Sequence, residues 1–426
     1  MVNDIVNNAR VAFDASPPVG DLAYSRYCHI LAELLAENWE TVLRANERDC
    51  AEAMRRGLAP VLIERLRLGD DQLKYLIRLA KNISSELPEV TKAGHWMNVE
   101  EWGTIRRVPK PLGVVLLVYE ARPTVTVEGA LIPVAVGNAV LLRGGKEMVC
   151  TDAALSKLIQ RALLEAGLPS SMVTIIADPD RSVFRDLLKC HESIDVLIPR
   201  GSPSLINYCR SATSIPVIAS GGGINHIYVD ESADLQRAAE IALDSKLAEP
   251  TACNTVELLL VHYKVANKFV EHLISTSAQR NDKVTIRLGL NLEGNGRGDV
   301  TVEALAEHDL GREFLDATIG VLSVPSLESA VAHIRRYGSK HTEGIISSDA
   351  AVVDRFITLV DAAAVIVNGS LRLHDGPTLK LGSEISISTG RLHVRGSVTL
   401  ASLMTYTWVV DAKGSLRADR SSSCQL

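Results

Sequence analysis

Apolar residues recur at helical spacing through the first fifth of the chain. Between residues 22 and 83 they fall three or four positions apart, with charged residues between them. The positions that define the pattern are Ile30, Leu31, Leu34 and Leu35, followed by Leu66, Leu73, Leu76 and Ile77. This spacing predicts amphipathic helices, and we expect their apolar faces to cover a sheet.

From residue 113 the pattern changes to short apolar runs that alternate with helical segments. The runs span residues 113–119, 139–142, 173–176 and 196–198, and the helical segments include 152–166 and 184–189. Strands separated by helices of this length form right-handed crossovers and hence a parallel sheet. The pattern therefore predicts a domain of the nucleotide-binding type.

A second alternation begins after residue 230. We expect helices at 235–247, 264–277 and 327–336, and strands at 256–261, 321–324 and 345–346. Two further strand-like stretches, 96–107 and 392–410, lie outside both alternations. The predicted fold class is α/β, with two Rossmann-like parallel-sheet domains and a small additional β element.

Composition and charge narrow the class of protein. The 426 residues, 46% of them hydrophobic, are enough for more than one core, and the net charge of −6 argues against a nucleic-acid binder. Seven cysteines without a CxxC pair predict neither a disulfide framework nor a zinc site, which favours a reducing compartment. No signal pattern or membrane-length apolar run is present, so we expect a cytoplasmic protein that acts on a small molecule.

Cys253 is the residue with the clearest chemical context. It lies in Glu249-Pro250-Thr251-Ala252-Cys253-Asn254-Thr255, directly before the apolar run 256–261. A thiolate that attacks a carbonyl needs donors for the oxyanion that forms, and the Cys253 N–H and the Asn254 side-chain amide are candidates. The alternative is that Cys253 only fills core space, as free cysteines often do.

This segment resembles the nucleophile loop of the γ-glutamyl phosphate reductase family, a branch of the aldehyde dehydrogenase superfamily. The family loop typically ends in Cys-Asn-Ala-Leu-Glu-Thr, and Cys253, Asn254 and Glu257 match it. The resemblance extends along nearly the whole chain. Similar segments are 45–46, 57–58, 118–123, 125–127, 137–145, 195–201, 226–230, 337–341 and 392–396.

The resemblance implies NADP(H) as the cofactor and assigns residues to it. Arg143, Gly144, Gly145 and Lys146 match the turn that holds the adenosine ribose, where a cation favours a 2′-phosphate. Pro199, Arg200, Gly201 and Ser202 match a second cofactor loop, before a helix whose N–H groups face the pyrophosphate. Glu313 matches a glutamate that binds the nicotinamide ribose. The alternatives are a charged turn after a strand and an exposed glutamate.

The resemblance also implies the chemistry. Aldehyde-oxidising relatives hydrolyse a thioester with a glutamate 34 residues before the nucleophile; here 253 − 34 = 219, and position 219 is Ala, where the family typically has Glu-Thr-Gly-Val-Gly. Reduction of an acyl phosphate does not need that base. Arg122 matches an arginine at the active site that could hold the phosphate or the oxyanion, or it could instead pair with Glu120 or Glu128.

Two substrate-facing segments depart from the family pattern. Residues 246–250 place the acid Glu249 where Gln-Arg-Pro is common, and residues 375–384 place Pro377 and Lys380 in a stretch that is usually Asp-Gly-Gly-Glu-Phe-Gly. Reversed charges of this kind can change which substrate is held. Ser383 and Glu384 begin a hydroxyl-rich stretch that matches the family and could bind an α-carboxylate.

The main hypothesis is an NADPH-dependent reductase that converts γ-glutamyl phosphate, or a close analogue, into glutamate 5-semialdehyde through a Cys253 thioester in proline biosynthesis. The alternatives are a CoA-acylating aldehyde dehydrogenase and a catalytically silent partner of a kinase. We expect no metal, because His226 and His393 show no ligand spacing and suit structural hydrogen bonds. A homodimer or homotetramer is expected, with a glutamate 5-kinase-like protein as a further partner.

The resemblance also assigns roles to parts of the chain. Residues 1–230 are expected to bind NADP(H), and residues 231–370 to carry the nucleophile. Residues 371–426 would return the chain and, with residues 95–108, supply strands for oligomerisation.

Overall fold

The computed structural model describes residues 2–99 and 103–416, which form two compact units. The first contains residues up to 198, residues 212–216 and residues from 399 onward; the second contains residues 199–211 and 217–398. The sequence-based boundary at residue 230 differs from this division, because β7 (Asn225–Val229) hydrogen-bonds with strands of the second unit. Residues 100–102 of the expected strand at 96–107, and residues 417–426 of the expected C-terminal segment, lie outside the description.

The first unit contains the expected parallel sheet. Its four strands lie in the order β5 (Val173–Ile175), β4 (Ala139–Arg143), β3 (Val114–Tyr119) and β6 (Val196–Arg200). The pairs β3–β4 and β4–β5 are parallel, and every residue of β3 is buried. A strand buried on both faces shows a continuous apolar run rather than an alternation, which is what residues 114–119 display.

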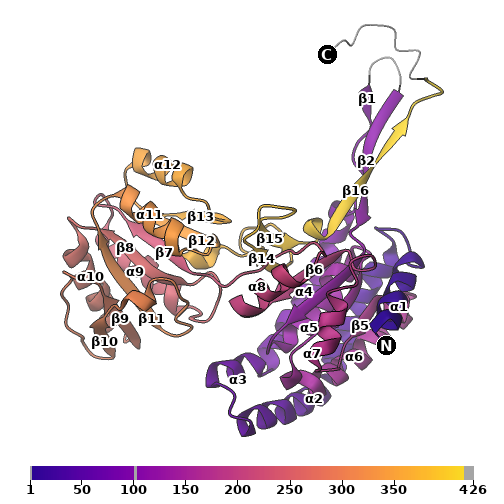
Figure 1. Cartoon of the computed structure of the whole chain (residues 1–426), viewed down its shortest axis with the longest axis horizontal. Helices are drawn as coiled ribbons and strands as arrows, with labels where there is room; N and C mark the ends of the chain where they lie inside the picture. The colour runs from indigo at the N-terminus through magenta and orange to yellow at the C-terminus, as the bar shows by residue number, and fades with distance from the viewer. Residues whose placement is uncertain (1, 100–102, 417–426) are drawn as a thin grey trace. The chain divides into compact units, whose positions relative to one another are not determined.

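Helices surround this sheet (Figure 1). The periodic stretch 22–83 forms α2 (Leu22–Arg55), α3 (Pro60–Leu66) and α4 (Asp70–Val90), as the spacing predicts. The first unit also contains α1 (Val2–Asp14), α6 (Val149–Ala166) and α7 (Arg181–Leu187). Helix α2 packs against α4 and α6, and its Tyr27 hydroxyl donates to the Ala130 carbonyl of α5 (Pro123–Ala135) at 3.0 Å.

Helix α5 (Pro123–Ala135) has no counterpart in the sequence prediction. All its residues except Thr124 are buried, so it has no polar face to create a helical period. Prolines at both ends of the segment, Pro123 and Pro133, further disguise it. Pro123 occupies the first helical turn, where its missing N–H has no intrahelical partner to lose.

The second unit is built on a seven-stranded sheet. The strands lie in the order β10 (Val300–Ala304), β9 (Val284–Leu288), β11 (Thr318–Val324), β8 (Val256–His262), β7, β12 (Thr342–Ile346) and β13 (Ala364–Val367). Each pair of neighbours is parallel. The second expected parallel-sheet domain is therefore confirmed.

Alternate residues of the central strands bury opposite faces of this sheet. On one face Leu259 and Val261 pack with α9 (Leu235–Leu247) and α10 (Ala266–Gln279). On the other, Leu258 and Leu260 pack with α11 (Leu327–Tyr337) and α12 (Ala350–Leu359). The unit is thus a three-layer arrangement in which both helical layers draw on a single strand, β8.

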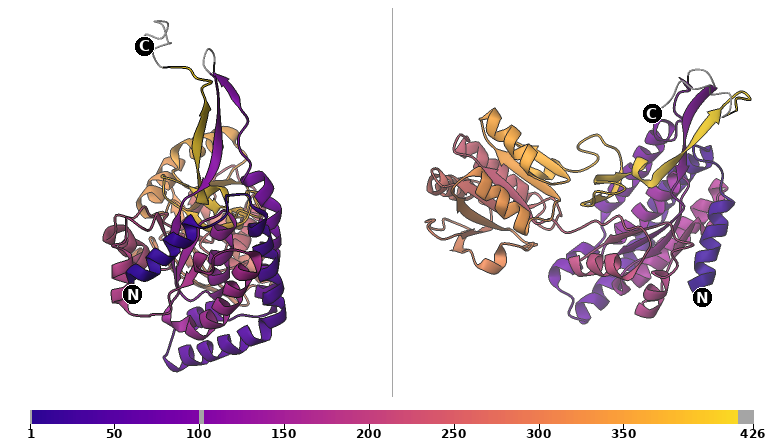
Figure 2. Two further views of the ribbon diagram at one scale, coloured as in Figure 1. Left: turned by 90° about the vertical axis from the view of Figure 1, so that its right-hand side faces the viewer. Right: turned by 45° about the horizontal axis from the view of Figure 1, so that its top comes forward.

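A three-stranded antiparallel ribbon belongs to the first unit. It is formed by β1 (Met97–Val99), β2 (Gly103–Pro111) and β16 (Met404–Asp411), and Figure 2 shows the β2–β16 pair extending beyond the helices in both views. The expected strand at 392–410 is divided. Its first part, β15 (Gly396–Thr399), pairs with β14 (Glu384–Ser388), because a 3-10 turn at Ala401–Leu403 interrupts the extended chain before β16.

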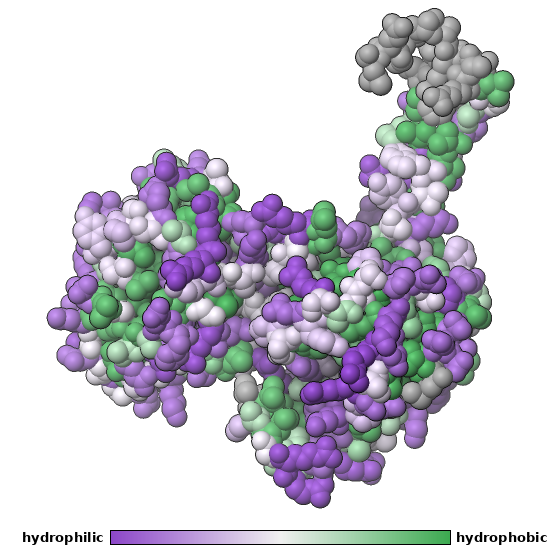
Figure 3. Space-filling view, in the orientation of Figure 1, coloured by the Kyte–Doolittle hydropathy of each residue, from purple (hydrophilic) through white to green (hydrophobic). Residues whose placement is uncertain are grey.

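Apolar side chains are exposed on this ribbon. Trp96, just before β1, and Tyr406, Trp408 and Val410 of β16 are each more than 40% exposed. The Arg107 guanidinium lies 4.7 Å and 4.8 Å from the centroids of the Tyr406 and Trp408 rings. The space-filling view shows hydrophobic surface along the ribbon (Figure 3). Among the described residues, no helix has the length and apolar character needed to cross a membrane.

Asn138 joins three segments of the first unit. It is fully buried, its side-chain amide donates to the carbonyls of Pro133 and Leu403 at 3.1 and 3.0 Å, and its oxygen accepts from the Gly113 N–H at 2.9 Å. These bonds connect the end of α5, the start of β3 and the turn before β16. A buried backbone group that loses such a partner costs roughly 1–3 kcal/mol.

Replacement of Asn138 by Ala is therefore expected to lower the free energy of unfolding by about 2–4 kcal/mol. Urea denaturation followed by circular dichroism measures the change. A variant as stable as the parent would show that these three bonds contribute nothing net.

Candidate functional site

The nucleophile loop, residues 248–255, connects α9 to β8 and is held by its own hydrogen bonds. The Ala252 N–H donates to the Glu249 carbonyl at 3.1 Å, and the Thr255 N–H donates to the Ala252 carbonyl at 3.2 Å. The Thr255 hydroxyl reaches back to the carbonyls of Ser245 and Glu249 at 3.2 and 3.0 Å. Cys253 is half-buried on this loop, which contains two consecutive hydrogen-bonded turns.

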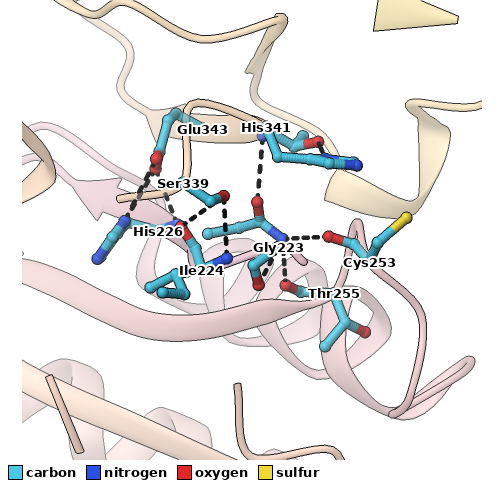
Figure 4. A network of polar contacts seen from close by, with 10 residues as sticks. Gly223, Ile224, His226, Cys253, Thr255, Ser339, His341 and Glu343 are labelled. Atoms are coloured by element: carbon cyan, nitrogen blue, oxygen red, sulfur yellow. Dashed lines mark hydrogen bonds and ion pairs between the residues drawn. The ribbon is translucent and has the colours of Figure 1, made fainter. Parts of the chain in front are cut away.

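The backbone of Cys253 is anchored separately from its thiol. Its carbonyl accepts a 2.8 Å hydrogen bond from the Asn225 side chain. Figure 4 shows this carbonyl directed into a polar network that includes Gly223, His226 and Glu343, with the Cys253 sulfur pointing away from it. The thiol is therefore presented by a fixed main chain.

Asn254 is buried, and both ends of its amide are engaged. Its Nδ2 donates to the His374 carbonyl at 3.0 Å, and its Oδ1 accepts from the Arg372 guanidinium. Arg372 also pairs with Glu249 at 2.7 Å. The acid at position 249, where the family commonly has a cation, thus has its own cationic partner in this chain.

A short hydroxyl–imidazole chain lies beside this loop. The Thr342 hydroxyl is 2.7 Å from Nδ1 of His341 and 2.7 Å from Nδ1 of His374. Burial lowers the pKa of each of these two histidines to about 4, so both are neutral at pH 7.

A buried ion pair supports the start of β8. Lys246 and Glu257 are 2.9 Å apart with almost no exposure, and the Phe314 N–H donates to the same Glu257 oxygen at 3.0 Å. Burial raises the pKa of Glu257 to about 7 and lowers the pKa of Lys246. Glu257, matched to the family loop on sequence, is therefore a structural anchor of that loop.

Glu313 lies against the glycine loop, residues 221–223. Its Oε1 accepts from the Gly223 N–H at 2.9 Å, and a Cβ added to Gly222 would collide with its carboxylate. A Cβ on Gly223 would collide with the Cys253 carbonyl oxygen. The second unit therefore brings Glu313 and Cys253 together across one glycine-only segment.

Ser383 and Glu384 lie in the same unit. Ser383 is buried, and Glu384 begins β14 after the compact turn 375–382, in which the Leu381 N–H donates to the Gly376 carbonyl at 2.8 Å. Burial raises the pKa of Glu384. Lys380 adopts a left-handed conformation with φ of 57° in this turn. The unusual Pro377 and Lys380 thus shape the segment that leads into Ser383.

Arg122 and the turn 143–146 share an edge of the first unit's sheet. Arg122 directly precedes α5 after β3, and Arg143–Lys146 follows β4, the parallel neighbour of β3. The Ala121 N–H donates to Glu147 at 2.8 Å, which links the two segments. Carboxyl ends of parallel strands are the usual binding edge in open α/β sheets.

A buried polar chain lies beneath the turn 143–146. The Tyr119 hydroxyl is 2.8 Å from the Thr126 hydroxyl, which donates to Asp152 at 2.7 Å. A Cβ added to Gly144 would come within 2.7 Å of the Asp152 carboxylate. Burial raises the pKa of Asp152 to about 7.

The two cations of this turn have different surroundings. The Arg143 guanidinium donates weakly to the carbonyls of Pro179 and Asp180 and lies 4.9 Å from the centroid of the Phe184 ring. Burial lowers the pKa of Arg143. Lys146 is exposed at the start of a 3-10 turn, so it is the cation open to solvent here.

Pro199, Arg200, Gly201 and Ser202 lie at the end of β6 and directly before α8 (Pro203–Ala212). They belong to the second unit, where Arg200 pairs with Ser220 in a parallel bridge. The Ser202 hydroxyl accepts from the Leu205 N–H at 3.4 Å. The cofactor residues named from sequence therefore come from both units.

His226 forms structural hydrogen bonds, as expected, and His393 lies at the surface. His226 is fully buried, with Nδ1 3.1 Å from Glu343 and its main-chain N–H donating to the same carboxylate at 2.8 Å. No group of three or more His, Cys, Asp or Glu side chains within residues 2–99 and 103–416 is arranged to hold a metal. None of the six cysteines among these residues forms a disulfide.

Sequence reasoning missed several residues that position the thiol. Asn225, Arg372 and His374 bond the nucleophile loop from segments distant along the chain. Thr342 in turn bonds Asn225 and His374. Only the triple glycine at 221–223 gives a local signal, since three consecutive glycines indicate close approach of backbone.

The chain is similar in sequence and in fold to proteins of known family. Residues 2–284 match the model of the aldehyde dehydrogenase family. The γ-glutamyl phosphate reductase of Sodalis glossinidius is 38% identical over 385 residues, which cover 89% of this chain and 91% of that protein. The crystal structure of γ-glutamyl phosphate reductase from Thermotoga maritima has 32% identity and a TM-score of 0.88, covering 98% of this chain and 99% of that one. An acetylating aldehyde dehydrogenase from Geobacillus thermoglucosidasius, 18% identical with a TM-score of 0.72 and 96% coverage of each chain, shares the fold.

The raised pKa of Asp152 predicts a pH-dependent cost to stability. Below about pH 4 the carboxyl is protonated in both the folded and unfolded states. As the pH rises toward 7 only the unfolded state ionises, so the parent loses stability across this interval. Asp152→Asn keeps an oxygen to accept from Thr126 and does not titrate.

The free energy of unfolding of Asp152→Asn, relative to that of the parent, is therefore expected to be about 2 kcal/mol higher at pH 8 than at pH 5. Urea unfolding at the two pH values measures the difference. A constant difference between variant and parent would contradict a buried carboxyl with a raised pKa.

Proposed function

Because the chain belongs to the γ-glutamyl phosphate reductases of the aldehyde dehydrogenase family, we propose that it reduces γ-glutamyl phosphate to glutamate 5-semialdehyde in proline biosynthesis. The observation that carries this proposal is the anchored nucleophile loop. Its backbone is fixed by Asn225, Asn254 and Thr255, while the Cys253 sulfur points away from the network that holds its carbonyl. A fixed main chain is what a nucleophile needs to meet its carbonyl in one geometry.

The Cys253 thiolate attacks the acyl carbon of the substrate. The C–S bond forms, the C–O bond to phosphate breaks, and inorganic phosphate leaves with the electron pair. When bound, the reduced nicotinamide supplies the hydride that turns the thioester carbon into the aldehyde carbon. The C–S bond then breaks and the sulfur recovers its electron pair, which frees the aldehyde.

Position 219 supports reduction rather than hydrolysis of the thioester. Ala219 is buried, and its carbonyl accepts a 3.2 Å hydrogen bond from the Thr389 N–H. An alanine cannot activate water, so the side chain at this position gives water no advantage over hydride. The proposed oxyanion donors are the Cys253 N–H and the second N–H of the Asn254 amide, whose first N–H donates to the His374 carbonyl. Arg122, Ser383 and Glu384 are the proposed substrate contacts.

The first unit fits a phosphate-bearing dinucleotide at the turn 143–146. The glycines at 144 and 145 bring the main chain close to the Asp152 and Glu147 carboxylates, where a Cβ would collide, and Lys146 offers an exposed cation at the carboxyl edge of the sheet. We assign NADP(H) to this turn, with Arg143 and Lys146 near the 2′-phosphate. Pro199, Arg200, Gly201 and Ser202 precede α8 and are assigned to the pyrophosphate, and Glu313 to the nicotinamide ribose.

The exposed ribbon supports a homo-oligomer. Tyr406, Trp408 and Val410 expose apolar surface on β16, which is an edge strand of the sheet formed by the described residues. Edge strands with exposed apolar side chains can pair with another chain. A dimer or tetramer formed through β16 would cover them. A kinase that supplies the acyl phosphate completes the proposed set of partners, because acyl phosphates are short-lived in water.

Replacement of Cys253 by Ala is expected to reduce phosphate-dependent NADP⁺ reduction with glutamate 5-semialdehyde by a factor of about 10³ or more. Cys190→Ser serves as the matched control, because burial raises the pKa of the Cys190 thiol and no role is assigned to it. Turnover that survives in Cys253→Ala would overturn the proposal. Turnover that needs CoA instead of phosphate would indicate an acylating dehydrogenase, and a folded parent with neither activity would indicate a silent partner protein.

Combined replacement of Tyr406 and Trp408 by Ser is expected to shift the protein from oligomer to monomer in sedimentation-velocity experiments at micromolar concentration. Leu290→Ser, at a position 89% exposed in the second unit, is the control and should leave the oligomer intact. A monomeric parent would refute the role of the ribbon.

A further inference from the structure

Asn225 stands at the start of β7 and is fully buried. Its Nδ2 donates to the carbonyls of Thr255 and Cys253 at 2.7 and 2.8 Å and lies 3.3 Å from the Gly223 carbonyl. Its Oδ1 accepts from the Thr342 N–H at 3.1 Å. One primary amide, with two N–H groups and one oxygen, thus contacts four main-chain groups from three segments.

These main-chain groups cannot be satisfied by the sheet. Cys253 and Thr255 precede β8, Thr342 begins β12, and Gly223 precedes β7. The register between β7 and β8 also shifts here, since Asn225 pairs with Val256 and His226 with Leu258, which leaves Glu257 without an opposite residue. Irregularities of this kind leave ladder groups unpaired and redirect the chain next to them.

Gly223 connects this anchor to Glu313. Its N–H donates to the Glu313 carboxylate, and its missing side chain leaves the space that the Cys253 carbonyl occupies. The backbone of Gly223 therefore lies between the Glu313 carboxylate and the Cys253 carbonyl. The Asn225 amide contacts the carbonyls of both Gly223 and Cys253.

We infer that Asn225 is a positioning residue for the Cys253 thiol and that, through Gly223, it sets the spacing between the thiol and Glu313. This inference rests on the proposed function for its catalytic meaning, but not for its geometric content. Loss of the amide removes the donor that the Cys253 and Thr255 carbonyls share and loosens the main chain at Cys253. A displacement of about 1 Å at a nucleophile can cost on the order of 10²-fold in rate.

The test uses Asn225→Ala and the isosteric Asn225→Asp in the full-length protein. Asn138→Ala is the matched control, because Asn138 is an equally buried amide that bonds three main-chain groups in the first unit, away from any proposed site residue. Two quantities are measured per folded molecule. They are kcat and KM for phosphate-dependent NADP⁺ reduction, and the rate of Cys253 alkylation by iodoacetamide, located by mass spectrometry.

We expect both Asn225 variants to lose about 10- to 100-fold in kcat with less than about a threefold change in KM for NADP⁺. Their Cys253 alkylation rate should differ from the parent by at least about threefold, whereas Asn138→Ala should match the parent in both measurements. Asn225→Asp keeps the shape of the side chain, so it provides the answer if Asn225→Ala fails to fold.

The inference is overturned if the folded Asn225 variants alkylate like the parent, whatever their kcat, because the thiol would then be placed without the amide. It is also overturned if alkylation changes while kcat does not. Failure of the proposed function gives a different result: the parent lacks turnover, and the alkylation comparison alone then decides the geometric claim.

Discussion

Main-chain carbonyls and N–H groups that lie inside the protein beyond the ends of the strands need partners, and this constraint organises the second unit. At the amino ends of β7, β8 and β12 the ladder stops while the chain is still buried. Side chains provide the missing donors and acceptors: Asn225, Thr255, Asn254 and Glu313 each bond backbone from a different segment. The reactive thiol sits on a loop whose own backbone has been satisfied in this way.

The candidate site residues lie at the carboxyl ends of the strands in the first unit's sheet and at the amino ends of the strands in the second unit's sheet. In the first, Arg122 and the turn 143–146 lie at the carboxyl edge of β3 and β4, where binding sites of open α/β sheets are usually found. In the second, Cys253 precedes β8 and therefore lies at the amino edge. Bonds across the sheet do not reach this edge, which explains why so many polar side chains are buried there.

Much of this fold could be predicted from the sequence, because period and length are local properties. The helices between residues 22 and 83, the parallel strands and the Cys253 loop all follow from runs of neighbouring residues. Helix α5 was missed because its uniform burial removes the polar face that reveals a helix. The break between β15 and β16 was missed because Leu400–Leu403 is as apolar as the strands beside it.

The candidate site was predictable only where a motif carried it. Cys253 and Glu257 belong to one short segment. Asn225 and Arg372 bond that segment from distant parts of the chain, and this tertiary contact is not revealed by a single sequence. Glu249 illustrates the limit. Considered alone it reverses an expected charge, whereas the structure pairs it with Arg372 and removes the conflict.

The burial of α5 also bears on how the chain acquires its structure. A helix without a polar face has no stable existence in water, and α5 contacts α2, α4, α6 and β4. Of these, β4 and α6 emerge from the ribosome after it. During synthesis this apolar stretch is therefore exposed until β4 and α6 have been made. Over that interval it is the kind of segment that chaperones bind.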